Sequence, residues 1–192
     1  SCGMKKILVV VFAIAVVFAT AASAQTPYVA VYFDDTYQTM TADCPDAPPG
    51  TVPDSAYVVT HNWNMWVNAI EYAIAYPPQI FWTGDQIAPG ILAIGQSDVT
   101  LGGIGMTWPL PANGFGSLFL QKFFFFWMCE GCDGNWDSPI TVVPYPQSGQ
   151  VRAVRWPDLA IFQGVGLTSL ICPSPGIPVE EKTWGGIKAL YE

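Results

Sequence analysis

The stretch Phe115–Cys132, with the sequence FGSLFLQKFFFFWMCEGC, constrains the fold more than any other part of the chain. Successive side chains of a strand point to opposite faces. Strict alternation predicts two faces, one with Phe119, Gln121, Phe123, Phe125 and Trp127, and the other with Leu118, Leu120, Lys122, Phe124, Phe126 and Met128. Both faces are apolar from Phe123 onward. Because an uncovered strand of this kind would aggregate, we expect either another part of the same chain or a second subunit to cover its outer face.

The first 24 residues are typical of a secretory signal peptide. Three residues precede Met4, the basic pair Lys5-Lys6 follows, and Ile7–Phe18 is an apolar run too short to cross a bilayer comfortably. Small residues at Ala22–Ala24 suit a cleavage site before Gln25. We therefore expect a secreted or cell-surface protein without a membrane anchor after cleavage. The expected divisions are an upstream remnant plus signal peptide at 1–24, a folded domain at 25–178 and a C-terminal tail at 179–192.

Charge argues against two classes of partner. After removal of Lys5 and Lys6, five basic residues remain against 15 acidic ones, so the net charge is near −10. Such a surface repels nucleic acid and anionic membranes. Charged residues make up 11% of the chain and hydrophobic residues 51%, whereas a solvated monomer carries about 25% charged residues. This balance is compatible with large contacts between subunits, and also with many secreted all-β domains.

Short β-forming runs separated by turn residues predict an all-β sandwich of about eight to ten strands. A short helix or an extended tail is expected over Glu180–Tyr191. The expected strands are Thr26–Phe33, Ala56–Thr60, Met65–Tyr76, Ile80–Thr83, Ile91–Ile94, Asp98–Trp108, the aromatic stretch, Ile140–Val143, Val151–Val154, Leu159–Phe162 and Gly164–Cys172.

Three segments carry a resemblance to a known family. Val67–Tyr76 followed by Pro77-Pro78, the glycine-rich Gly103–Met106 and the aromatic Phe115–Phe126 together resemble the middle of cohesin-like and related immunoglobulin-like sandwiches. The resemblance implies a sandwich fold and transfers no catalytic residue. Separately, Thr183–Tyr191, TWGGIKALY, including Trp184, resembles a tail of uncharacterised secreted proteins from environmental bacteria, which implies no function.

Four cysteines remain after cleavage, and an even number in an exported protein favours disulfides. The residues are Cys44, Cys129, Cys132 and Cys172. Three pairings are possible, and we favour Cys129 with Cys132 and Cys44 with Cys172. A redox-active pair would need a helix N-terminus, whereas Cys129 follows a strand. A zinc site would need a second close pair, which Cys44 and Cys172 do not form in the sequence.

Two acidic segments have oxygen ligands that could hold calcium. Asp133, Asn135 and Asp137 have the alternating spacing of a calcium loop, but Ser138 stands where glycine is required and Pro144 replaces the final glutamate. The second segment is the loop between Asp34 and Asp46, with carboxylates at Asp34, Asp35, Asp43 and Asp46. Both are more often solvated turns, so we predict no metal and no cofactor.

Catalytic residues are not predicted. His61 is the only histidine and no serine or cysteine motif surrounds it. Glu71 lies in an apolar strand and would need a second carboxylate at a fixed distance to act as a general acid. A pair with Arg152 or Arg155 is the simpler expectation. The chain is therefore predicted to be a non-enzyme.

The sequence is compatible with two functions. The leading hypothesis is a structural subunit of an extracellular filament or surface layer, in which Gln25–Phe33 or the tail after Cys172 is donated to a neighbouring copy. Expected self-association residues are Tyr28, Val29, Val31, Phe33, Phe123, Phe124, Phe125, Phe126 and Trp184. The alternative is a cohesin-like or carbohydrate-binding module, with sugars stacking on aromatic rings. The candidate rings are Trp63, Trp66, Trp82 and Trp136.

Overall fold

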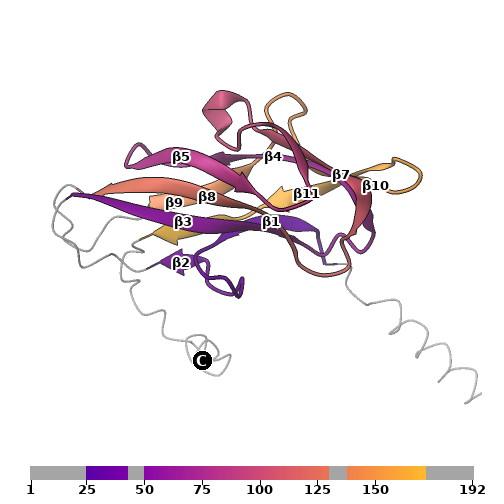
Figure 1. The fold of residues 1–192 in the computed structure, drawn as a ribbon, viewed down its shortest axis with the longest axis horizontal. Helices are drawn as coiled ribbons and strands as arrows, with labels where there is room; N and C mark the ends of the chain where they lie inside the picture. Colours follow the sequence, from indigo (N-terminus) through magenta and orange to yellow (C-terminus); the bar gives the residue numbers. More distant parts are fainter. Residues whose placement is uncertain (1–24, 43–49, 130–137, 172–192) are drawn as a thin grey trace, which may run out of the picture.

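The structure is a computed structural model that describes residues 25–42, 50–129 and 138–171, with the backbone alone at 50–53, 128 and 129 (Figure 1). Within these ranges the chain forms twelve strands and one short 3-10 turn, η1. The strands are β1 Tyr28–Tyr32, β2 Thr41–Ala42, β3 Gly50–His61, β4 Trp66–Ala75, β5 Ile80–Ile87, β6 Leu92–Gly95, β7 Ile104–Asn113, β8 Leu118–Cys129, β9 Ser138–Val143, β10 Val151–Arg155, β11 Ile161–Gly166 and β12 Thr168–Ile171, with η1 at Val99–Leu101.

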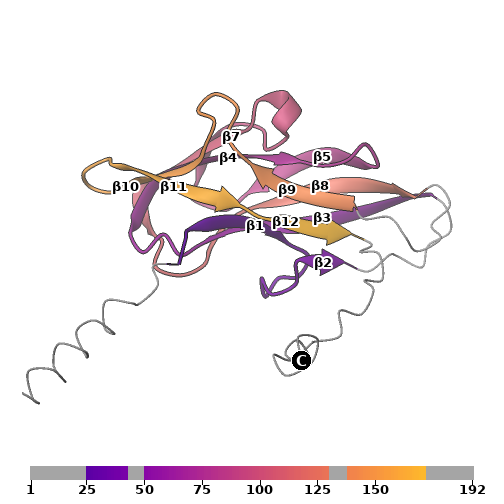
Figure 2. The same cartoon turned by 180° about the vertical axis from the view of Figure 1, so that it is seen from behind.

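Hydrogen bonds join these strands into one continuous path that folds back into two layers. The β5–β1 sheet has the order β5-β8-β3-β1, and the β6–β11 sheet has the order β6-β7-β4-β10-β11. Parallel pairing of β11 with β1 connects the layers, and β4 also pairs with β9, which leads to β12 and β2. Figures 1 and 2 show β4 and β7 on one side of the molecule and β1, β2 and β3 on the other. The predicted all-β sandwich is confirmed.

The main core lies between the two layers, and alternation places its members there. β4 contributes Tyr72 and Ile74, and β8 contributes Phe123 and Phe125, all of them almost completely buried. Each such side chain contributes about 1.5–3 kcal/mol through its removal from water. Within the described residues no helix is long and apolar enough to cross a membrane.

The aromatic strand β8 does not alternate strictly, because it contains a β-bulge. Phe119 and Gln121 pair with consecutive residues of β3, which leaves Leu120 without a partner on that strand. Leu120 and Gln121 are therefore both buried, while Phe119 packs against the outer face. The expected alternation is wrong for Leu118, Phe119 and Leu120, because Leu118 also packs against the main core, and it is correct from Gln121 onward.

A segment of the same chain covers part of the outer face of β8. The loop Phe33–Met40, which lies beside β2 in Figure 1, packs over β1, β3 and β8. Tyr37 stacks on Phe119 with ring centroids 6.1 Å apart and planes inclined by 6°. The cover ends before Phe126, which is 38% exposed. The buried members of this second apolar cluster are Ala30, Tyr32 and Val59.

Asp34 holds the covering loop in shape. Its carboxylate accepts hydrogen bonds from the Thr36 hydroxyl, from the Thr36 and Gln38 amides at 2.9 and 3.2 Å, and from the Thr39 amide. The bond from the Thr36 hydroxyl is the main reason that the pKa of Asp34 lies well below its usual range. Hydrogen bonds within the turn therefore satisfy this carboxylate.

Strand β1 is paired on both sides by its own chain. It runs antiparallel to β3 along its whole length and parallel to β11 at Tyr28 and Val29. Beyond β11, Leu167 donates its amide to the Val29 carbonyl at 3.0 Å. In this fold β1 therefore pairs with strands of its own chain. The tail after Cys172 lies outside the described residues.

Most expected strands are present in the structure. Where the observed strand bounds differ from the expected ones, the cause is local pairing or hydrogen bonding. β3 begins at Gly50, inside the region expected to be a polar loop, because it pairs with β8 as far as Cys129. The expected strand from Asp98 begins instead with η1, where the Asp98 carboxylate accepts the Thr100 amide at 2.7 Å. The short strand β2 was not expected. The C-terminal helix or tail, Trp184 included, lies outside the described residues.

Close packing at Gly166 generates a stability prediction. A Cβ atom at this position would fall on the Val142 carbonyl oxygen of β9, whereas a Cβ at Gly116 would meet no atom within 4 Å. We expect Gly166→Ala to lower the free energy of unfolding by about 1–3 kcal/mol through overpacking. Urea denaturation measures the change. Gly116→Ala is the control, and equal stability of the two variants would contradict the packing described here.

Candidate functional site

The outer face of the β6–β11 sheet is the most extended candidate for a binding surface. The pairing register aligns its outward side chains in two rows across five strands. The alternate residues on β4, β7 and β10 are buried in the core, so the side chains of these rows point outward. The rows are Leu92, Thr107, Ala69, Val154 and Ile161, and then Ile94, Gly105, Glu71, Arg152 and Gln163.

Aliphatic side chains dominate both edges of this face. On β6, Leu92 is 62% exposed and Ile94 is 78% exposed. On β11, at the opposite edge, Ile161 is 57% exposed and Val165 is 45% exposed. Between the edges the rows contain Ala69 and Val154 together with polar residues, so the exposed apolar side chains are concentrated at the two edges. Exposed apolar surface can mark a site of interaction with other molecules.

One ion pair stands at the centre of the face. Arg152 Nε of β10 lies 2.7 Å from Glu71 Oε2 of β4, and both side chains are partly exposed. The expectation that Glu71 pairs with an arginine is confirmed. The hydrogen bond that Arg152 donates to Glu71 raises the pKa of Arg152, so the guanidinium remains charged at neutral pH. A molecule that covered this part of the face would have to satisfy both members of the pair.

Aromatic rings gather where β4 begins and β10 ends. Trp66 and Phe115 meet edge to face with ring centroids 6.4 Å apart, and both are about half exposed. The Trp156 amide donates to the Trp66 carbonyl at 2.9 Å, which brings a third exposed ring to this end. Arg155 lies 4.7 Å from the Phe162 ring centroid and is paired with Asp158.

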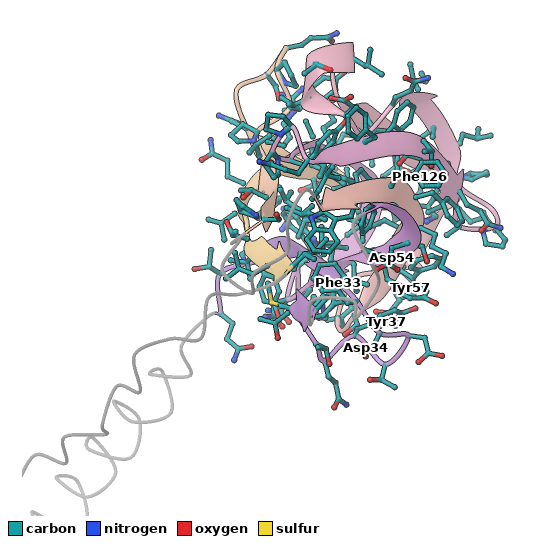
Figure 3. All side chains as sticks on the ribbon, turned by 90° about the vertical axis from the view of Figure 1, so that its left-hand side faces the viewer. Phe33, Asp34, Tyr37, Asp54, Tyr57 and Phe126 are labelled. Atoms are coloured by element: carbon teal, nitrogen blue, oxygen red, sulfur yellow. The ribbon has the colours of Figure 1, made fainter. Side chains whose placement is uncertain are left out.

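The outer face of the β5–β1 sheet is a second, smaller surface. Lys122 Nζ lies 4.9 Å from the Tyr57 ring centroid and 5.7 Å from that of Phe124. Phe81 of β5 pairs directly with Phe126 of β8, and both rings are partly exposed. Figure 3 shows Tyr37 and Tyr57 close together beneath Phe126. The loop Phe33–Met40 already occupies the part of this face near Phe119, so less of it remains open.

The expected self-association residues separate into two groups. Val29, Val31, Phe123 and Phe125 are buried in the core and unavailable to a partner in this fold. Tyr28, Phe33 and Phe124 are half-buried, and Phe126 is exposed. The aliphatic edges of the β6–β11 sheet were missed. Ile91–Ile94 was expected as a strand, but nothing in its sequence shows that it lies at a sheet edge.

The three described candidate tryptophans differ in exposure and in environment. Trp63 is buried and donates its indole N–H to Thr60, and Trp66 is exposed at the end of β4. Trp82 is half-buried and donates to Asp85 at 3.2 Å. Trp136 lies outside the described residues.

Most of the cysteines and most of the candidate calcium ligands lie outside the described residues. Cys44, Cys132 and Cys172 lie outside the described residues, and of Cys129 only the backbone is described. The expected pairings therefore stay predictions. The proposed ligands Asp133, Asn135 and Asp137, and the residues Asp43 and Asp46, also lie outside. Within residues 25–42, 50–129 and 138–171, no group of three histidine, cysteine or carboxylate side chains is placed to hold a metal.

His61 of β3 packs against aromatic rings of β1 and contacts the residue before β8. Its ring stacks on Tyr28 at 4.8 Å and meets the edge of Tyr32 at 5.6 Å. Nδ1 lies 2.9 Å from Ser117 Oγ, and Nε2 is buried without a partner among the described residues. Burial lowers the pKa of His61, since it penalises the charged imidazolium.

Comparisons with known proteins bear on the fold. Sequence searches find no matching family model and no matching curated protein. The cohesin module of a family 33 glycoside hydrolase from Clostridium perfringens aligns with a TM-score of 0.54 at 8% identity, over 76% of this chain and 95% of that chain. A chain of a type I cohesin–dockerin complex from Clostridium thermocellum aligns with a TM-score of 0.51 at 12% identity, over 79% and 97%. The chain has a cohesin-like fold. The resemblance carried by β4, β7 and β8 is thereby confirmed for the fold.

The environment of His61 generates a pH prediction. A histidine with a lowered pKa binds its proton less readily in the folded chain than in the unfolded chain, where the pKa is about 6.5. Stability is therefore complete above this value and falls as the pH drops through it towards the lower folded pKa. We expect the free energy of unfolding to fall more steeply between about pH 7 and pH 5 in the wild type than in His61→Phe. Parallel curves for the two proteins would contradict this environment.

Proposed function

We propose that this chain is a non-catalytic, extracellular binding module that captures a partner protein on the outer face of its β6–β11 sheet. The observation that carries the proposal is the open face formed in register by five strands, with exposed aliphatic side chains at both edges and one ion pair at its centre. It is the more open of the two sheet faces, since Phe33–Met40 covers part of the other.

The fold supports this function over a filament subunit. Cohesin modules are among the solved structures that share the fold, and one of them was solved in a cohesin–dockerin complex. β1, one of the two segments expected to be donated between copies, is paired within its own chain. Export, which the signal-peptide pattern predicts, would place the face outside the cell.

The chemistry of the face specifies the partner. Exposed Leu92, Ile94 and Ile161 require apolar side chains opposite them, and the Glu71–Arg152 pair requires polar groups near the centre. The chain is acidic overall, with a formal net charge of −8, so a partner with basic residues at the rim would associate faster. We therefore propose a compact protein module with an apolar, basic-rimmed surface, of which dockerins are the first class to test.

Calorimetric titration against a panel of type I dockerins tests the proposal. We expect one of them to bind, and Ile94→Asp to weaken this binding at least about tenfold, because a carboxylate would be buried in the apolar contact. Phe126→Asp, an equally drastic change on the other sheet, is the matched control and should bind like the wild type.

Light scattering of the unliganded protein completes the test. The proposal expects a monomer that shifts to a one-to-one complex with the partner. Growth into high-mass polymers without a partner would restore the filament hypothesis. Binding weakened by Phe126→Asp but not by Ile94→Asp would move the site to the opposite face and overturn the assignment made here.

A further inference from the structure

A compact polar cluster lies where the segment between β6 and η1 meets the β5–β1 sheet. Asp85 of β5 is its centre. Asp85 Oδ1 accepts hydrogen bonds from Ser97 Oγ at 2.7 Å, from Gln121 Nε2 at 3.2 Å and from Trp82 Nε1 at 3.2 Å. Asp85 Oδ2 accepts the Ser97 amide at 2.8 Å. A hydroxyl and a carboxamide from distant parts of the chain thus meet on one carboxylate oxygen.

Ser97 is held firmly in this position. Its carbonyl accepts the Ile74 amide of β4 at 2.6 Å, while its amide and hydroxyl are both bound to Asp85. The residue is completely buried. Ser97 therefore spans the two layers of the sandwich, with its backbone fixed to β4 and its hydroxyl directed to the carboxylate of β5.

Gln121 is equally buried, and its amide is only half satisfied. The side chain is 0% exposed, and Nε2 donates to Asp85. Among the described residues, Gln121 Oε1 and the buried Tyr72 Oη have no hydrogen-bond partner. Burial, with a further contribution from the Asp85 charge, raises the pKa of Tyr72 well above its usual value, so the phenol keeps its proton. Gln121 Oε1 and Tyr72 Oη are thus both buried polar atoms that no described residue satisfies.

We propose that Ser97 and Gln121 form an intramolecular ester cross-link, with Asp85 transferring the proton. Ser97 Oγ attacks Gln121 Cδ, and Asp85 Oδ1 takes the hydroxyl proton. The C–N bond then breaks, the same Oδ1 atom returns the proton to Nε2, and ammonia leaves. A hydroxyl and a carboxamide become an ester and ammonia, so the step is balanced without any oxidant or co-reactant.

Three features of the cluster favour this reaction. The nucleophile and the leaving nitrogen contact the same oxygen, so one carboxylate can serve both proton transfers without moving. Burial of Ser97 and Gln121 excludes the water that would otherwise hydrolyse the product. Gln121 Oε1 accepts no hydrogen bond among the described residues, so it is free to accept one as negative charge develops on it.

The cross-link would fasten the two layers together. Ser97 is anchored to β4 through its backbone, and Gln121 belongs to the aromatic strand β8. A covalent bond between them restricts the unfolded chain and therefore stabilises the fold, as a disulfide does. The cross-link would act independently of the cysteines and of the binding face on the opposite side of the β6–β11 sheet.

Cleavage at methionine in acid, followed by mass spectrometry, tests the proposal on the full secreted chain. Met106 lies between the two residues, so Ser97 falls in fragment 66–106 and Gln121 in fragment 107–128. We expect one joined species, lighter than the sum of the two fragments by one ammonia. Brief treatment with dilute alkali should separate it, because alkali hydrolyses esters and spares amides, and position 121 should then be recovered as glutamate.

Variants locate the reaction. Ser97→Ala removes the nucleophile and Asp85→Asn removes the proton carrier, so both should give separate fragments. Ser169→Ala is the control, because Ser169 is also buried but donates to the Val31 carbonyl rather than to a carboxylate. It should keep the joined species. Total mass alone is not the readout, since cyclisation of an N-terminal Gln25 would also release ammonia.

Two results would overturn the proposal. The first is recovery of separate, unmodified fragments from the folded wild-type chain, which needs no variant to interpret. The second is a joined species that survives alkali or persists in Ser97→Ala, since it would reflect a different bond.

Discussion

Every major feature of this fold depends on covering a strand that is apolar on both faces. β8 places Phe123, Phe125 and Trp127 in the sandwich core, and these rings leave Phe119, Phe124 and Phe126 on the outside. The bulge at Leu120 adds a further apolar side chain to the core and turns Phe119 outward. The loop Phe33–Met40 then closes over Phe119, held by the hydrogen bonds to Asp34.

This division of the surface determines which face is available to a partner. Tyr37 and its neighbours occupy part of the β5–β1 sheet, whereas the outer rows of the β6–β11 sheet remain open. Exposed leucine and isoleucine at both edges, with an ion pair between them, combine apolar contact with a means of orientation. The two outer faces of the sandwich therefore differ, since one is covered in part by its own chain and the other is left open.

Sequence patterns predicted the class of fold and most strands, because hydrophobic alternation and turn residues are local signals. The Glu71–Arg152 pair was also anticipated, since a carboxylate in an apolar strand needs a partner. The bulge at Leu120 was not, because the register of β8 depends on its pairing with β3. The exposed edges at Ile94 and Ile161 were missed for a similar reason. Whether a short apolar strand is central or at an edge is decided by its neighbours, which are distant in sequence.

Sequence patterns could not predict the cluster at Asp85 for the same reason. Its three main members come from β5, from the segment before η1 and from β8, and no sequence spacing connects them. Glutamine in an aromatic strand and serine in a turn are unremarkable by themselves. Their meeting on one carboxylate oxygen follows from the way that the β6–η1 segment crosses between the layers and bonds to Ile74.

Hydrogen–deuterium exchange, compared between the free and the partner-bound protein, tests the central claim most directly. Slower exchange of backbone amides reports the elements that a partner covers or stabilises. The account predicts added protection on β6, β7, β10 and β11, with little change in Phe33–Met40 and β8. Protection confined to Phe33–Met40 and β8 would show that the partner binds the aromatic face, and it would contradict the assignment of the open β6–β11 face as the binding surface.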